Sequence, residues 1–437
     1  MRNDNRDTEQ ERCNPTVVVP AVVEPRLDTD TLPPHPQTSA KERRFAFGIL
    51  MLSILCLGLG QTILFAVLPP IARQIGIPDI QVGIIFTFSA ICWVISSTFW
   101  GRRSDLTGRK PIILLGVGAF AISIAALGIV MELGARGITS VFVTFYLLFF
   151  LRSIHGSFAS AAPAAGQAYV ADRTNPDERT SSLASMAAAF GIGATLGPGI
   201  GSAAARFGPM VPLLIVAAIA VIVFITILRY LPERSRPISK KKVPKLRITD
   251  KRLRYSLIYG ICGGVLMVVP IQIVGFYLID RLSLQDVAAS QLLGVAFMIH
   301  AMASLFAQLV IIQRFNIPRI VLLQMAPPMI MIGHLIIAFG YDFGTVAFGL
   351  LITGVGAGLF MPAYTASVSL SVSADEQGAA SGLANSASAA GFIIAPLLAF
   401  GLYSLGPSIP FFCSAALAFL QTLYATFVLR PHLEQHI

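Results

Sequence analysis

Long apolar stretches alternate with short polar ones along almost the whole chain. A bilayer core about 30 Å thick requires roughly 20 apolar residues of helix for each crossing, and the apolar stretches here reach that length. The pattern predicts an all-α membrane protein with twelve transmembrane helices. The predicted spans lie at residues 45–68, 80–100, 111–131, 139–170, 181–204, 209–231, 255–279, 290–312, 319–340, 345–370, 379–403 and 409–429.

The distribution of Lys and Arg between the spans predicts the orientation. Cytoplasmic loops of membrane proteins carry an excess of basic residues. With a cytoplasmic N-terminus, the outer loops hold only Arg73, Arg136, Arg206 and Arg281, so we expect both termini in the cytoplasm. The inner side then holds Lys41, Arg43, Arg44, Arg102, Arg103, Arg109, Lys110, Arg173, Arg179, the basic run from Arg234 to Arg254, Arg314, Arg319 and Arg430.

The composition agrees with a membrane protein. Of 437 residues, 55% are hydrophobic and 12% are charged, whereas about a quarter are charged in soluble domains. The net charge of +10 does not indicate nucleic-acid binding, because the basic residues lie between the apolar spans. The five cysteines have no paired or metal-ligand spacing. We therefore expect no nucleic-acid partner, no metal and no cofactor.

The longest polar segments divide the chain into two bundles of six helices. The first apolar run starts near Phe45, too late and too long for a cleaved signal peptide. The central basic segment is interpreted as a solvated connector, with contact to anionic lipid headgroups as the alternative. The expected units are a disordered cytoplasmic tail at 1–44, an N-terminal bundle at 45–231, a basic cytoplasmic linker at 232–254, a C-terminal bundle at 255–430 and a cytoplasmic tail at 431–437.

An internal repeat supports this division. Two segments align at one constant offset, the first running from the end of the fourth span into the fifth and the second from the end of the tenth span into the eleventh. Some transporters are built from parallel repeats, with the substrate site between the halves near the membrane midplane. The aligned residues are Asp177-Glu178-Arg179, Gly193 and Gly197-Pro198 against Asp375-Glu376-Gln377, Gly391 and Ala395-Pro396.

The loop after the second span reads Gly101-Arg-Arg-Ser-Asp105-Leu-Thr-Gly108-Arg109-Lys110. Glycines allow a tight turn, and Asp at the membrane surface can pair with Arg. The loop resembles the signature of the major facilitator superfamily in full and at the expected place. The resemblance implies that Asp105 and Arg109 latch the two halves in the outward-facing state. A loop that serves topology alone is the alternative.

The fourth span contains Arg152 and His155, followed by Gly156. Arg at that depth is costly unless it faces a partner or a cavity. Arg152 and Gly156 resemble the Arg-x-x-x-Gly element that the superfamily associates with proton transfer, and His155 lies one turn from Arg152. An Arg that only fixes helix packing is the alternative. Beyond the span, Asp172 resembles part of an acidic and basic loop motif, which implies a pair with Arg109.

The fifth span contains Gly193, Gly197, Pro198 and Gly201. This pattern resembles the Gly-Pro-x-x-Gly-Gly element of exporters, particularly drug:proton antiporters, although Ser202 replaces the last Gly. Pro removes one helical hydrogen bond and Gly allows close helix approach, so a general packing face is the alternative. The resemblance favours export.

No acidic residue lies clearly inside a span, so the proton site is open. Asp280 and Glu132 lie at span ends and are interpreted as interfacial, while His155, His300 and His334 are the titratable alternatives.

Cavity candidates are the polar and aromatic residues that the spans contain. An apolar pocket with few polar groups suits amphipathic solutes. These candidates are Gln61, Thr62, Phe149, Gln272, Tyr277, Gln308 and Tyr364.

The sequence contains no nucleotide-binding Gly-x-x-x-x-Gly-Lys-Ser/Thr loop and no His-Glu-x-x-His, Cys-x-x-Cys or Gly-x-Ser-x-Gly element. We therefore do not expect an enzyme. The hypothesis is a monomeric secondary transporter in a bacterial inner membrane that exports amphipathic small molecules, drugs or a metabolite in exchange for protons. The alternatives are a proton-coupled uptake symporter, for example of an organic anion, and a membrane sensor that does not transport.

Overall fold

The computed structural model describes residues 40–174, 176–233, 246, 249–282, 286–315, 317–373 and 376–434. Some side chains near the starts of α6, α9 and α13 also lie outside the described set. Most of the predicted N-terminal tail and basic linker, and the end of the C-terminal tail, fall outside these residues.

The described chain is almost entirely helical. The predicted fourth, eighth and twelfth spans each consist of consecutive helical segments, and the other nine are single helices. The segments are α1 (Ala40–Ile75), α2 (Asp79–Thr107), α3 (Arg109–Ala135), α4 (Val141–Ala159), α5 (Ala161–Ala171), α6 (Pro176–Ala205), α7 (Val211–Tyr230), α8 (Arg254–Leu282), α9 (Asp286–Phe306), the π-helix η2 (Ala307–Ile312), α10 (Gln313–Phe315), α11 (Arg319–Ala338), α12 (Phe343–Ser369), α13 (Gln377–Tyr403), α14 (Ile409–Tyr424), the π-helix η4 (Ala425–Leu429) and α15 (Arg430–Glu434).

The prediction of twelve apolar spans is confirmed. Among the described residues, eleven helical spans are long and apolar enough to cross a membrane. The remaining predicted span is α6, a helix of 30 residues that includes side chains outside the described set. The fourth span breaks at Ser160, where α4 ends and α5 begins. Pro163 explains this break, because proline has no N–H to donate to the carbonyl four residues earlier.

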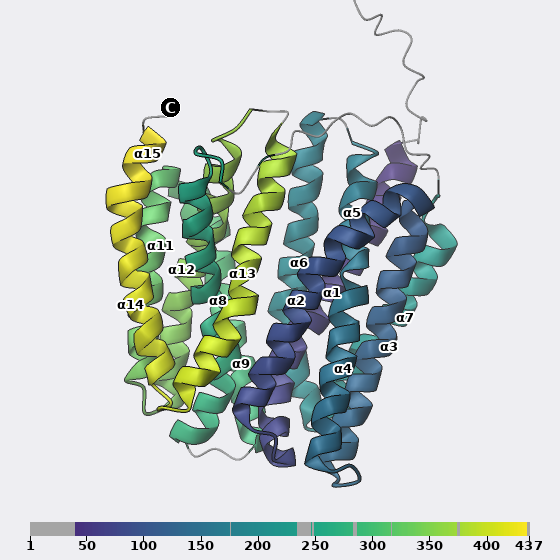
Figure 1. The fold of residues 1–437 in the computed structure, drawn as a ribbon, viewed down its shortest axis with the longest axis vertical. Helices are drawn as coiled ribbons and strands as arrows, with labels where there is room; N and C mark the ends of the chain where they lie inside the picture. Colours follow the sequence, from purple (N-terminus) through teal and green to yellow (C-terminus); the bar gives the residue numbers. More distant parts are fainter. Residues whose placement is uncertain are drawn as a thin grey trace, which may run out of the picture.

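The two halves of the chain lie side by side (Figure 1). Helices α1 to α7 form one bundle and α8 to α15 form the other. We call the end of the molecule that carries the C-terminus the terminal end. The opposite end, the far end, carries the turns at 76–78, 136–140, 206–210, 339–342 and 404–408.

Within each half, glycines bring the helices of the first and fifth spans into close contact. In the first half, a Cβ on Gly193 of α6 would lie 2.0 Å from the Leu55 carbonyl oxygen of α1. In the second half, a Cβ on Gly391 of α13 would lie 2.2 Å from the Gly264 carbonyl carbon of α8. Gly193 and Gly391 are equivalent positions of the internal repeat. Each half therefore has its first and fifth spans packed backbone to backbone.

Candidate functional site

The loop motif forms an ion-pair cluster at the terminal end. Gly108 separates α2 from α3 with a φ of 96°, a conformation that glycine adopts without strain. The Arg109 guanidinium contacts Asp105 at 2.5 Å and donates through Nε to Asp172 at 2.8 Å. It also donates to the Ser104 hydroxyl at 2.7 Å. The Arg109–Asp172 pair that the resemblance implied is therefore present, and it joins the α2–α3 turn to the end of α5.

The contacts of the remaining loop residues also lie within the first half. Lys110 donates from Nζ to the Leu228 carbonyl oxygen of α7 at 2.9 Å. A Cβ on Gly101 would meet nothing within 4 Å, so this glycine is not required by close packing here. Arg109 pairs with Asp105 and with Asp172, and all three residues belong to the first half. A latch between the halves stays a prediction.

Arg152 lies in the middle of α4 and is 2% exposed. Among the described residues, its Nε and Nη1 atoms have no hydrogen-bond partner. Its guanidinium carbon lies 5.7 Å from the centre of the Phe86 ring of α2, a weak cation–π contact. The Arg152 carbonyl oxygen accepts a hydrogen bond from the Ser89 hydroxyl at 2.9 Å. The packing alternative therefore explains the backbone of Arg152 but not its charge.

The other coupling candidates lie beside Arg152 in the first bundle. His155 is fully buried and its Nδ1 lies 2.9 Å from the Ser123 hydroxyl of α3, while its Nε2 has no partner in the described part of the chain. A Cβ on Gly156 would lie 2.4 Å from the Ser89 carbonyl oxygen. Gly156 thus lets α2 and α4 approach closely. Arg152, His155 and Gly156 share the interface of α2, α3 and α4.

The exporter-type glycines form the face of α6 that contacts α1. Besides Gly193, a Cβ on Gly197 would lie 2.2 Å from the Thr62 hydroxyl, and one on Gly201 would lie 2.4 Å from Ile63 Cγ1. Pro198 lies inside α6 and is buried. This geometry fits the packing reading of the motif, and its role in export stays a prediction.

The polar cavity candidates fall into two groups. Gln61 of α1 and Gln272 of α8 each have a buried side-chain oxygen without a hydrogen-bond partner among the described residues. Thr62 is satisfied within its own helix, since its hydroxyl donates to Gly58 O at 3.1 Å. Gln308 donates to the Ser304 hydroxyl at 3.3 Å. Gln61 and Gln272 are therefore the two candidates with a buried oxygen that lacks a partner within the described residues.

The aromatic cavity candidates have structural partners. The Tyr277 hydroxyl donates to the Ile337 carbonyl oxygen at 2.8 Å, and the Tyr364 hydroxyl donates to the Ala384 carbonyl oxygen at 3.0 Å. Both tyrosines are buried inside the second half. The ring of Phe149 on α4 packs against the ring of Phe88 on α2, with centroids 4.8 Å apart. The structure does not bring the two tyrosines to Arg152, and their role as cavity residues stays a prediction.

The two remaining histidines lie in the second half. His300 Nδ1 is 3.1 Å from the Leu350 carbonyl oxygen. His334 is fully buried, and neither of its ring nitrogens has a hydrogen-bond partner among the described residues. Neither histidine lies on the helices that carry Arg152 or His155.

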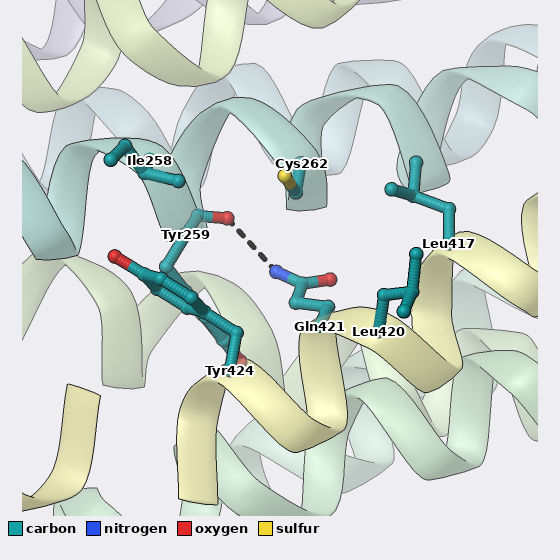
Figure 2. A pocket seen from close by; sticks show the side chains of 7 residues that line it. All are labelled: Ile258, Tyr259, Cys262, Leu417, Leu420, Gln421 and Tyr424. Carbon is teal, nitrogen blue, oxygen red and sulfur yellow. Dashed lines mark hydrogen bonds between the residues drawn. The ribbon is translucent and has the colours of Figure 1, made fainter. Parts of the chain in front are cut away.

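A shallow groove of about 250 Å³ lies between α8 and α14. Figure 2 shows Gln421 reaching across it, and its Nε2 donates to the Tyr259 carbonyl oxygen at 2.9 Å. None of the candidates from the sequence lines this groove. Its lining residues are Ile258, Tyr259, Cys262, Leu417, Leu420, Gln421 and Tyr424.

An ion pair in the second half holds the start of α8 to the start of α13. Arg252 donates to Glu376 through two nitrogens at 2.9 and 3.0 Å, and also pairs with Asp250 at 3.0 Å. The hydrogen bonds from Arg252 lower the pKa of Glu376 to about 2. Arg252 and Asp250 belong to the predicted linker, where sequence reasoning saw only basic charge.

The far end contains an ionic contact between the halves that sequence reasoning missed. Arg73 at the end of α1 pairs with Asp79 of α2 at 2.5 Å and with Asp280 at the end of α8. The Tyr403 hydroxyl of α13 donates to Asp280 at 2.6 Å. The signal available in the sequence was the placement of Arg73 and Asp280 at the ends of corresponding spans.

Comparison with known proteins places the chain among membrane transporters. The family model described as Major Facilitator Superfamily matches residues 50–396. Multidrug resistance protein 1 of Bacillus subtilis (strain 168) is 25% identical over 85% of this chain and 93% of that protein. Multidrug resistance protein 2 of the same organism is 32% identical over 43% of this chain and 44% of that protein. This second match therefore spans less than half of each.

A solved structure gives the same fold. The bacterial homolog of the human lysosomal transporter Spinster, in an inward-facing and occupied conformation, superposes with a TM-score of 0.72 at 14% sequence identity, covering 92% of this chain and 99% of that one. This likeness concerns the fold. Because the family model covers well over half of the residues, the chain belongs to the major facilitator superfamily.

Proposed function

We propose that the protein is a monomeric, proton-coupled exporter of amphipathic small molecules in the inner membrane, working by alternating access. The observation that carries the proposal is the difference between the two ends of the molecule. At the far end, the Arg73–Asp280 pair joins the halves. At the terminal end, the ion pairs of Arg109 and of Arg252 stay within their own halves. This arrangement is expected of a carrier whose far-end gate is closed.

The distribution of basic residues indicates which side of the membrane the binding site faces in this conformation. Under the positive-inside rule, the terminal end faces the cytoplasm. A carrier closed at the far end then exposes its binding site to the cytoplasm, where an exporter collects its cargo. The two bacterial relatives named as multidrug resistance proteins support export by this chain as well.

Arg152 and His155 are the proposed coupling residues. A buried guanidinium with two unpaired nitrogens is costly in a membrane interior. That cost is offset when a negatively charged or hydrogen-bonding group enters the site during the cycle. His155 lies one turn away with one free ring nitrogen, so it can exchange a proton as the charge around Arg152 changes.

Gln61 and Gln272 are the proposed polar contacts of the cargo. Each has a side-chain oxygen without a partner among the described residues, and the two lie on the first helix of each half. A few polar groups within an apolar pocket are typical of sites for amphipathic ligands. The site therefore favours cargo that offers hydrogen-bond donors on an apolar body.

Growth of cells that lack their major efflux pumps tests this function. Cells expressing the protein are challenged with a chemically broad panel of toxic compounds, and intracellular accumulation is measured for every hit. We expect resistance that disappears with a protonophore and in Asp105→Asn. Asp342→Asn is the matched control, because Asp342 caps α12 at the far end and Asn caps helices equally well. Resistance that survives the protonophore would refute proton coupling.

Uptake of an organic anion is the second candidate, and the unpaired charge of Arg152 is the observation that favours it. An anionic group bound at Arg152 would satisfy the free nitrogens directly. The direction of flux separates the two functions. Export lowers the amount of a compound inside expressing cells, whereas uptake raises it.

A further inference from the structure

The far-end gate joins four helices, α1 and α2 of the first half and α8 and α13 of the second, around Arg73. The Arg73 guanidinium donates from Nε to Asp79 Oδ1 at 3.0 Å and from Nη2 to Asp280 Oδ2 at 2.8 Å. Its carbon atom lies 4.9 Å from the centre of the Phe276 ring of α8. Tyr403 of α13 donates to the same Asp280 oxygen at 2.6 Å. The side chains of Arg73, Asp79 and Asp280 are 22%, 24% and 30% exposed, so water reaches the cluster.

The charges within this gate do not balance. Among the described residues, the charged or titratable side chains that contact Asp280 are Arg73 from α1 and Tyr403 from α13, and Asp79 from α2 shares Arg73 with it. The adjacent Arg281 is placed over the Tyr341 ring, 4.1 Å from its centre. Asp286 at the start of α9 has a side chain outside the described set. Two carboxylates therefore share one guanidinium, which leaves one excess negative charge.

The two carboxylates differ in what happens when the halves separate. Asp79 belongs to the same half as Arg73, so this pair stays intact in an open gate. Asp280 belongs to the other half and would lose its cation. An ionised carboxylate that loses its partner in a partly buried position is destabilised. Protonation removes this penalty, and it also weakens the attraction that holds the gate closed.

We propose that Asp280 is a proton-binding site of the far-end gate, and that a proton from the far side of the membrane opens the gate by replacing Arg73 as its partner. This inference rests on the proposed alternating-access function. The proton arrives from and returns to the same side of the membrane. The site therefore sets the open fraction of the gate and is separate from the residues that carry protons across.

Distance measurements between spin labels test the gate without any cargo or gradient. Ile138 in the first half and Leu405 in the second are exposed positions in far-end turns, and both are changed to Cys in a background without the five native cysteines. The purified full chain is placed in lipid nanodiscs and the distance distribution is recorded from about pH 8 to about pH 5. We expect the population with the longer distance to grow at least about twofold as the pH falls.

Three variants separate the gate from general effects of pH. Asp280→Asn keeps the shape of the side chain but removes its charge, so the longer distance should dominate at every pH. Tyr403→Phe removes a donor that stabilises the carboxylate, so the opening transition should move to higher pH. Glu132→Gln is the matched control, because Glu132 pairs with Arg136 at the far end within one half. It should leave the transition unchanged.

The outcomes distinguish this inference from the function on which it rests. The gate proposal is overturned if the distance distribution of the unaltered protein does not change with pH. It is also overturned if the Asp280→Asn variant responds to pH as the unaltered protein does. Neither result changes the outcome of the resistance assay, which tests export. Loss of resistance in that assay, with a pH-dependent distance, would instead overturn export and leave the gate in place.

Discussion

At the scale of single residues, several buried polar groups have no hydrogen-bond partner among the described residues. Arg152 is buried without partners for Nε and Nη1, and Gln61 and Gln272 each hold a free oxygen, as judged from the described residues. Buried polar atoms in proteins are nearly always hydrogen-bonded. These exceptions lie in the interior of the helix bundle, and they support the proposal that Arg152, Gln61 and Gln272 contact cargo or protons.

The variant Arg152→Met separates stability from transport. Methionine fills a similar volume without charge, and replacing buried ionic groups by apolar ones is often neutral or stabilising. We expect an unchanged or higher melting temperature in detergent, together with a loss of transport of at least about tenfold. Thermal unfolding and resistance are measured on the same variant. A much lower melting temperature would show that Arg152 is mainly a packing residue.

The residue scale also shows where sequence reasoning stops. Arg152 was recognisable from its depth in an apolar span, and Asp172 from its place in a motif. Tyr277 and Tyr364 look like cavity residues in the sequence, yet their hydroxyls bond to backbone carbonyls of neighbouring helices. Which face of a helix meets its neighbour depends on tertiary packing, and uniformly apolar spans carry little periodicity to reveal it.

At the scale of helices, the length of apolar runs was enough to predict the spans. It did not predict their irregularities. The fourth span is broken at Ser160, and η2 and η4 are π-helical. Such irregularities depend on side-chain packing and on single residues such as Pro163. The repeat was more informative, since equivalent glycines pack α6 on α1 and α13 on α8.

Gly193→Ala tests the packing of α6 on α1. The added Cβ would lie 2.0 Å from the Leu55 carbonyl oxygen, so the two backbones must move apart. Overpacking of this kind costs about 1–3 kcal/mol, and we expect a lower melting temperature in detergent. Gly191→Ala is the control, because its Cβ would meet nothing within 4 Å. Equal stability of the two variants would contradict the close contact.

The Arg252–Glu376 pair makes the joint between α8 and α13 sensitive to acid. The pKa of Glu376 is lowered from 4.5 to about 2, so the stabilisation is complete above about pH 4.5 and is lost as the pH falls through about 2. Thermal unfolding of the unaltered protein and of Glu376→Gln is compared over this range. We expect the difference in melting temperature to be constant near neutral pH and to shrink in acid. A difference independent of pH would exclude this ion pair as its source.

At the scale of the whole molecule, the relation between the halves was beyond the sequence. Arg109 and Asp172 lie within one motif-rich half, and their pairing followed from the resemblance. Arg73 and Asp280 are 207 positions apart, and their contact depends on the relative orientation of the two helix bundles. That contact at the far end, together with the pairs of Arg109 and Arg252 inside their own halves at the terminal end, supports the proposal of a carrier whose far-end gate is closed.

Proton-coupled export is tested most directly by inverted membrane vesicles that acidify their interior by respiration. A pH-sensitive dye reports the gradient while a compound identified by the resistance assay is added outside. We expect the compound to enter and the gradient to fall in vesicles with the unaltered protein, and no such change with Asp105→Asn. Entry of the compound with an undisturbed gradient, or movement of the compound out of the vesicles, would contradict proton-coupled export.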